Sequence, residues 1–265
     1  MTFDLSEVTE GWIKRGERQS ARLIRAANGR PVLQLYEALA VFQMEISGRP
    51  DGVRPAGCDS MLQMMQSRAR TNSPQRPTPQ NWMELDREFA QYNQRRKAAV
   101  LVAAAAKAQS IGEWARVLYE LAAHDTAHCL EILAFAETEH PTGRLPSVGP
   151  ELRPVLTTQQ TIALAQLALI AEDHELAVER LHDGTSTLCR LLDQQGITNT
   201  GENAYVRELN AMEQRIREEH GIQQTLSEQL DDAVGHEDFE RAASLRDRIA
   251  QREAMMTERL VTPEP

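Results

Sequence analysis

Three stretches rich in proline and glycine interrupt the chain and limit how long any element between them can be. Proline cannot continue a helix or donate to a sheet, and glycine favours turns, so each stretch predicts a loop or linker. The stretches are TNSPQRPTPQ (71–80), PTGRLPSVGPELRP (141–154) and GITNTGEN (196–203). We therefore divide the 265 residues into an N-terminal segment (1–70), a middle domain (81–195) and a C-terminal arm (204–260).

The middle domain has the pattern of paired helices. Its apolar residues recur at helical spacing, and aromatic residues make up only 5% of the chain, which favours helices over sheets. Each predicted pair is joined by a polar turn short enough to make its two helices antiparallel. The helices are expected at 84–108, 113–138, 159–170 and 176–192, with turns at 110–112 and 172–174.

Two of these turns and the helices that follow them share a further pattern. SIGEWARVLYEL (110–121) and AEDHELAVERLHDG (171–184) each place an apolar residue before Ala and then Leu. This pattern resembles tetratricopeptide hairpins, in which neighbouring helical hairpins stack. The two turns are about 61 residues apart, however, whereas that repeat is about 34 residues long. A degenerate array of helical hairpins and an irregular helical bundle both remain open.

The N-terminal segment also shows helix-like spacing. A first stretch with Leu23 and Ile24 ends at Asn28-Gly29-Arg30-Pro31. In the next stretch, 32–46, apolar residues stand four, three and four positions apart, which predicts one stripe of a helix that ends at Gly48. These residues are Leu35, Leu39, Phe42 and Ile46. With this segment helical, the expected fold is all-α.

Charge and cysteine content exclude several classes of protein. The net charge of −10 and the pI near 5.3 argue against a general polyanion binder, because phosphate backbones require a basic surface. Cys58, Cys129 and Cys189 are odd in number and far apart, which argues against a disulfide framework. The start of the sequence lacks a signal-peptide pattern, and no apolar run approaches the ~20 residues of a membrane span. We expect a cytoplasmic protein that binds neither nucleic acid nor membrane.

The segment GRPDGVRPAG (48–57) is a candidate anion-binding loop. Proline presets its own φ, Asp51 can bond its own backbone, and the following glycine can adopt positive φ, so the centre of the segment predicts a tight turn. Arg49 and Arg54 flank this turn and could offer guanidinium groups to a carboxylate or phosphate. The alternative is a structural turn whose arginines pair with nearby acids.

Two histidines are weak candidates for a metal site. His124 and His128 stand at positions i and i+4, so both imidazoles lie on one face of the predicted helix. A third ligand would have to come from elsewhere, and the candidates are Glu139, His140, His174 and His182. Histidines that only pack between helices are the alternative, and we predict no metal and no cofactor.

A small basic and aromatic cluster lies in QYNQRR (91–96). Arg95 and Arg96 stand near Tyr92, which allows a contact with nucleic acid but fits a solvated helix face better.

The C-terminal residues 226–252 have the pattern of a short helical hairpin. Apolar residues share a face before the break at 235–238 and again after it. Gly235 suits a left-handed position that ends the first helix, and Phe239 is expected to fill the gap left by Ala242 and Ala243 at the turn. A unit of this size cannot bury enough surface alone, so the hairpin is expected to require a partner.

This hairpin is similar to the UVR motif, also called the UvrB/UvrC motif. The motif pattern is an acidic residue, Phe, Glu, any residue, Ala-Ala, any residue, Leu-Arg-Asp, any residue and Ile. It is matched by Asp238, Phe239, Glu240, Ala242, Ala243, Leu245, Arg246, Asp247 and Ile249. UVR motifs occur in two subunits of bacterial nucleotide-excision repair, in Clp-type protease ATPases and in the activator of protein arginine kinase. The resemblance implies a hairpin used for contact between proteins, with no catalytic activity.

Outside this hairpin the chain departs from those families. It has no GxxxxGK[ST] phosphate loop and no CxxC pair, so it is neither one of the ATPases nor a zinc-bearing kinase activator. The whole chain more closely resembles a group of UVR-domain proteins of planctomycete-type bacteria that carry a GRPDGxRPxG element. That resemblance brings no known chemistry with it.

The sequence thus predicts an adaptor that is not an enzyme and that docks through its UVR motif, in stress-response proteolysis or in DNA repair. The partner would be another UVR protein or a second copy of the chain. The expected contact residues are Leu230, Val234, Phe239, Ala242, Ala243, Leu245, Arg246 and Ile249, with hot spots at Phe239, Leu245 and Ile249. A self-associating scaffold is the first alternative. A metal- or anion-dependent enzyme that uses His124 and His128, or the loop with Arg49, Asp51 and Arg54, is the second.

Overall fold

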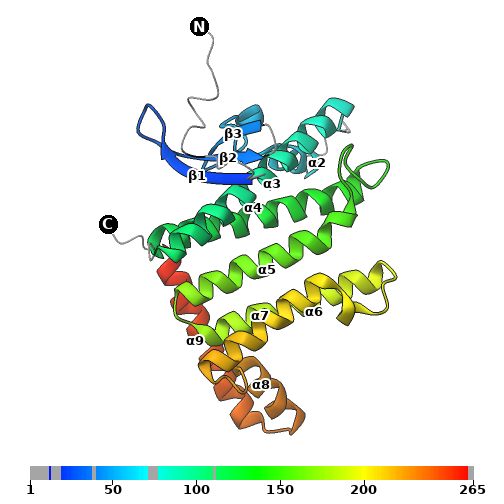
Figure 1. Ribbon diagram of the computed structural model, residues 1–265. Coiled ribbons are helices and arrows are strands. Elements are labelled where there is room, and N and C mark those ends of the chain that lie inside the picture. Colours follow the sequence, from blue (N-terminus) through cyan, green and yellow to red (C-terminus); the bar gives the residue numbers. More distant parts are fainter. Residues whose placement is uncertain (1–11, 13–18, 38–39, 71–76, 110–111, 262–265) are drawn as a thin grey trace.

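The computed structural model describes residues 12, 19–37, 40–70, 77–109 and 112–261. In this part of the chain a small antiparallel sheet covers one end of a series of α-helices (Figure 1). The strands are β1 (Gln19–Arg25), β2 (Pro31–Glu37) and β3 (Ala40–Glu45). The helices are α2 (Met61–Arg70), α3 (Pro79–Ala108), α4 (Gly112–Glu139), α5 (Arg153–Ile170), α6 (His174–Gln194), α7 (Ala204–His220), α8 (Leu226–Gly235) and α9 (Phe239–Val261). The protein is therefore mainly helical, as predicted.

The N-terminal segment is the exception, because the helices predicted there are wrong. Most of the residues predicted as helical there form the strands β1, β2 and β3, which pair in that order, and Leu39 of the predicted stripe lies outside the described residues. The break at 28–31 does not end a helix but closes a hairpin, in which the Ala26 N–H donates to the Arg30 carbonyl over 2.8 Å and Gly29 has φ +82°. Asn-Gly between two apolar runs is a hairpin signal, and this signal outweighs the spacing of four and three.

The sheet has one face on the helices and one polar face, which explains its alternating sequence. Leu33 and Leu35 are fully buried against Ala98 and Ala99 of α3. Between them, Gln34 lies on the other face and joins the three strands through its side chain. It accepts from Arg22 Nε over 2.8 Å and donates to Gln43 over 3.0 Å. Successive side chains of a strand point to opposite faces, and on β2 both faces are covered, because Val32 and Gln34 are buried as well.

The predicted helical pairs of the middle domain are present. The helices α3 and α4 pack against each other, as do α5 and α6, and the chain continues by packing α4 on α5 and α6 on α7. Side chains cap the N-termini of two of these helices. Thr78 forms a capping box with Asn81 at α3, and Asp173 accepts the Leu176 N–H at α6 over 2.9 Å.

The lengths of these helices do not fit a tetratricopeptide repeat. The helices α3 and α4 have 30 and 28 residues, and α5 and α6 have 18 and 21. Either pair exceeds the about 34 residues of a whole repeat. The helices of this array pack closely on one another. At Gly184 of α6 there is no room for a side chain, because a Cβ there would lie 2.1 Å from the hydroxyl of Thr161 on α5.

The C-terminal arm is divided between two packing units. Val206, Leu209 and Ile216 of α7 are buried in one cluster with Leu181 and Leu188 of α6, so α7 belongs to the helical body. The helices α8 and α9 pack on each other; α8 and the first part of α9 lie at the end of the molecule opposite the sheet, and the rest of α9 runs back toward the sheet (Figure 1). None of the described helices is long and apolar enough to cross a bilayer.

Candidate functional site

The hairpin of α8 and α9 has a closed inner face. Leu226 and Ala233 of α8 are buried against Ala242 and Leu245 of α9. Leu230 and Ile249 are partly buried at the edge of the same cluster. Because Ala233 and Ala242 are small, the helices can approach closely, as predicted for Ala242. The expected hot spot Leu245 is therefore occupied inside the hairpin.

The apolar surface left outside the hairpin lies next to its turn. The exposed fraction is 53% for Val234 and 69% for Phe239. Phe239 thus does not fill the gap at the turn, and that prediction is wrong. Ala243 and Arg246 are also exposed and follow Phe239 by four and seven residues, so they continue its stripe along α9. Half of the expected contact residues hold the hairpin together, and the other half are open to a partner.

The turn of the hairpin is fixed by its backbone and by one aspartate. The left-handed residue is Glu237, with φ +58°, and not Gly235, which remains the last residue of α8. The Asp238 N–H donates to the Ala233 carbonyl over 2.9 Å, and the Asp238 carboxylate accepts the Arg241 N–H over 3.1 Å. The carboxylate therefore lies at the start of α9, where the helix dipole favours negative charge.

The base of the hairpin is attached to the body by polar contacts. Glu175 and Glu179 of α6 accept the first N–H groups of α8, with Leu226 N–H on Glu175 and Ser227 N–H on Glu179 over 3.2 Å. Arg252 of α9 forms an ion pair with Glu179 and lies 3.9 Å from a carboxylate oxygen of Glu175. Burial raises the pKa of Glu175, against the opposing effects of Leu226 N–H and Arg252. These contacts orient the hairpin and leave its tip free.

A second polar contact joins α7 to the start of α8. Arg217 donates to Glu228 over 2.6 Å and to Glu213 over 2.9 Å. Burial alone would raise the pKa of Glu228, but hydrogen bonds from Arg217 and Thr225 outweigh it and leave the pKa below its usual value. Glu228 also completes a capping box with Thr225 at the start of α8.

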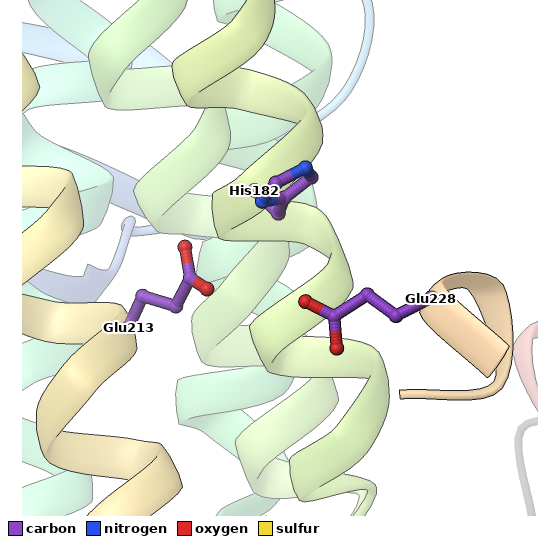
Figure 2. A group of neighbouring side chains, drawn as sticks. All are labelled: His182, Glu213 and Glu228. Carbon is purple, nitrogen blue, oxygen red and sulfur yellow. The ribbon is translucent and has the colours of Figure 1, made fainter. Parts of the chain in front are cut away.

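Glu213 and Glu228, the two carboxylates of this contact, lie close to His182, and residues of these types can bind a metal ion. Figure 2 shows His182, Glu213 and Glu228, whose ligand atoms all lie within 4.8 Å of one another. Arg217 already forms ion pairs with both carboxylates. A cation at this place would have to compete with the guanidinium, so the group is better explained as part of the hairpin attachment.

The loop 48–57 is a tight turn that docks on α3. The Asp51 carboxylate accepts the Val53 N–H over 3.0 Å, and Gly52 has φ +73°, as predicted for the centre of the segment. Arg49 is buried, and its Nε lies 3.2 Å from Asp51 and 3.6 Å from Glu88. Its charge is therefore already compensated. Arg54 remains exposed and lies 3.5 Å from Asp59.

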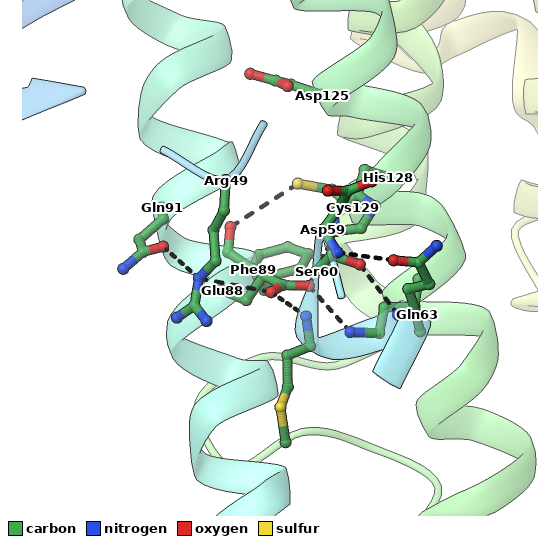
Figure 3. A network of polar contacts seen from close by, with 12 residues as sticks. Arg49, Asp59, Ser60, Gln63, Glu88, Phe89, Gln91, Asp125, His128 and Cys129 are labelled. Carbon is green, nitrogen blue, oxygen red and sulfur yellow. Dashed lines mark hydrogen bonds and ion pairs between the residues drawn. The ribbon is translucent and has the colours of Figure 1, made fainter. Parts of the chain in front are cut away.

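Glu88 of α3 is the centre of the network around this loop (Figure 3). Its fully buried carboxylate accepts the N–H groups of Met61 and Leu62 over 2.6 and 3.2 Å, and so caps α2. His128 Nε2 lies 3.1 Å from the same carboxylate, and Arg49 approaches it from the loop. The carboxylate thus ties three segments to α3.

Arg95 and Asp125 form a second buried centre beside the loop. Arg95 donates twice to Asp125, over 2.7 Å each, and its remaining terminal nitrogen donates to the carbonyls of Glu45 and Gly48. Both side chains are almost completely buried. The prediction of a solvated face at 91–96 is therefore wrong. No local sequence pattern indicates this pair, because the two residues stand 30 positions apart and lie on different helices.

The structure brings the loop and the two histidines together. A cavity of about 620 Å³ is lined by residues of both, among them Arg49, Arg54, His124 and His128. His124 Nδ1 lies 3.3 Å from Asp125, a hydrogen bond that raises its pKa, and His128 is held by Glu88. The third ligands considered from the sequence lie elsewhere: His140 packs on Trp82, His174 stacks on His220, and His182 belongs to the group in Figure 2.

Comparison with known families agrees with the motif in the hairpin. Residues 222–253 match the family described as UvrB/uvrC motif (UVR), so the chain carries a UVR motif. The match covers α8 and the first part of α9. Comparison of the chain with curated proteins and with solved structures found no match. The similarity to planctomycete-type proteins therefore stays a prediction.

Proposed function

We propose that the protein is a non-catalytic interaction protein that docks through the tip of its UVR hairpin. The observation that carries this proposal is the exposure of Val234 and Phe239, at 53% and 69%, beside an inner face that is already closed. Exposed aromatic and aliphatic side chains at a rigid tip are typical of the few residues that dominate an interface. The polar attachment at Glu175, Glu179 and Arg252 holds the tip in a defined orientation.

The proposed partner is another UVR hairpin, either in a second protein or in a second copy of this chain. The motif favours an adaptor that acts in stress-response proteolysis or in DNA repair. From residue 202 onward the chain has 15 acidic and 8 basic side chains, which disfavours direct binding of nucleic acid by the arm. The cysteines in the described part of the chain are unpaired, which fits a reducing cytoplasm.

Phe239→Ala is expected to abolish capture of the partner without unfolding the protein, because the removed side chain makes little contact within the chain. Hot-spot truncations cost about 2 kcal/mol or more of binding energy, which corresponds to at least a ~30-fold loss of affinity. The measurement is affinity capture of UVR proteins from the native cell, wild type against variant, with circular dichroism to check the fold. Met83→Ala on α3, an apolar residue that is 59% exposed, is the matched control and should leave capture unchanged. Capture that survives Phe239→Ala contradicts the proposal.

Self-association is the second candidate, and the same exposed tip favours it. It predicts a concentration-dependent dimer, measured by sedimentation, that Phe239→Ala and truncation near residue 222 both abolish. A dimer that persists in both variants would place the contact elsewhere on the chain.

An enzyme at the loop 48–57 is the weaker alternative. The cavity there joins Arg54 to both histidines, as such an enzyme would require. Its charged groups already serve the fold, however: Glu88 caps α2 and binds Arg49 and His128, and Asp125 binds Arg95. These contacts support our proposal that the protein is not an enzyme.

A further inference from the structure

Arg96 is a buried cation without a carboxylate partner among the residues that the structure describes. It is only 5% exposed, and its guanidinium donates to Asn93 over 3.0 and 2.6 Å and to Gln159. Both acceptors are neutral amides. Taking a charge out of water costs free energy that amides repay only in part, so a buried arginine is normally found with an acid.

The neighbouring arginine shows what such compensation looks like in the same helix. Arg95 is bound by both oxygens of Asp125 over 2.7 Å. No ion pair between Asp125 and Arg96 is found in the described part of the chain. Burial lowers the pKa of Arg96, and the nearby charge of Asp125 opposes this effect without cancelling it.

Arg96 lies on the wall of a cavity of about 400 Å³ between α3, α5 and α7. The apolar part of the walls includes Val100 and Leu101 from α3 and Ile162 from α5, and one carboxylate, that of Glu208 from α7, also lines the cavity. Lys97 also lines the cavity, but it is paired with Glu37 over 3.0 Å. A cavity of this size with apolar walls and a small number of polar groups is typical of a small-molecule site.

The guanidinium has donors left for a ligand. It carries five N–H groups, and the hydrogen bonds to Asn93 and Gln159 use three of them. Two N–H groups on its terminal nitrogens therefore remain. A carboxylate accepts two such donors side by side, and a charged acceptor supplies the missing counter-charge.

We propose that this cavity binds a small carboxylate with an apolar body, with the carboxylate on Arg96 and the body against Val100, Leu101 and Ile162. The ligand class follows from two features of the cavity, a buried cation with no ion pair among the described residues and a set of apolar side chains beside it. This site is separate from the hairpin, so the inference does not depend on the function proposed above.

Calorimetric titration of the full chain with octanoate tests the proposal. Octan-1-ol serves as the uncharged match, and inorganic phosphate as an anion without an apolar body. We expect octanoate to bind about tenfold more tightly than octan-1-ol, since a hydrogen-bonded charge pair contributes roughly this factor. Phosphate should also bind more weakly than octanoate, because it has no apolar body to bury. Equal binding of octanoate and octan-1-ol, or no binding of octanoate, would overturn the proposal.

Variants separate the charge of Arg96 from its structural role. Arg96→Met should weaken octanoate binding about tenfold, whereas Lys97→Met, which removes a cation already paired with Glu37, should change it by less than about twofold. If Arg96→Met does not fold, Leu101→Glu and Leu101→Gln replace it, because Leu101 is 38% exposed and tolerates a polar side chain. The Glu variant alone should lose octanoate binding. Unchanged binding in the Glu variant, or in a folded Arg96→Met protein, contradicts the assignment.

Discussion

Asp125→Ala is expected to lower the free energy of unfolding by about 3–5 kcal/mol, the usual cost of removing one partner of a buried ion pair. The variant leaves the Arg95 guanidinium buried with a positive charge, and Asp125 is its ion-pair partner among the residues that the structure describes. The loop 45–48 should loosen as well, because Arg95 also holds the carbonyls of Glu45 and Gly48. Urea unfolding followed by circular dichroism measures the change.

Two further variants show whether the cost comes from the unpaired charge. Glu120→Ala removes an acid from a half-buried pair with Arg116 on the same helix and should cost less than about 1 kcal/mol, because both side chains still reach water. The double variant Arg95→Met/Asp125→Leu removes both charges and should recover most of the lost stability. If Asp125→Ala costs as little as Glu120→Ala, the pair is not a centre of the fold.

Leu245→Asp is expected to unfold the hairpin and leave the helical body intact. Among the described side chains of the hairpin, four are buried in its core, and an aspartate in place of one of them would be a charge without a partner in a core that small. The body would keep its fold, because the contacts described between it and the hairpin are mainly polar. Hydrogen exchange should show loss of protection over 226–250 and unchanged protection in α3–α6.

Ala243→Asp is the matched control for this prediction. Ala243 lies two residues away on the exposed side of α9, so its variant should keep the hairpin folded. If Leu245→Asp unfolds the whole chain instead, the hairpin is part of the main core and the docking proposal fails. If it leaves the exchange of the hairpin unchanged, the inner face described above is not what holds α8 and α9 together.

The two kinds of hairpin in this protein show where sequence reasoning succeeded and where it failed. The pairs α3/α4 and α5/α6 were predictable, because apolar residues recur at helical spacing over many turns of each helix and the turn that joins the two helices of a pair is polar. The sheet was missed because its strands have only seven, seven and six residues. In so short a stretch, Leu35, Phe42 and Ile46 fit a helical spacing by chance, and the Asn28-Gly29 turn was the better signal.

The candidate sites were only partly predictable for a related reason. The UVR pattern located the hairpin from local sequence, but it could not say which side of α9 faces α8. The structure assigns Ala242 and Leu245 to the inner face and Phe239, Ala243 and Arg246 to the outer one. That choice depends on the register between two helices, which no single position encodes.

By itself the sequence determined the helical pairs, the breaks between them and the UVR motif, because these depend on residues that are neighbours along the chain. Only the tertiary structure determined the partners of the buried charges. Glu88 contacts α2, the loop 48–57 and His128, and Asp125 forms its ion pair with Arg95 and not with Arg96. A buried charge is stabilised by whichever group lies within a few ångströms after folding. Residues that meet in this way stand up to 40 positions apart here, so no local pattern could have paired them.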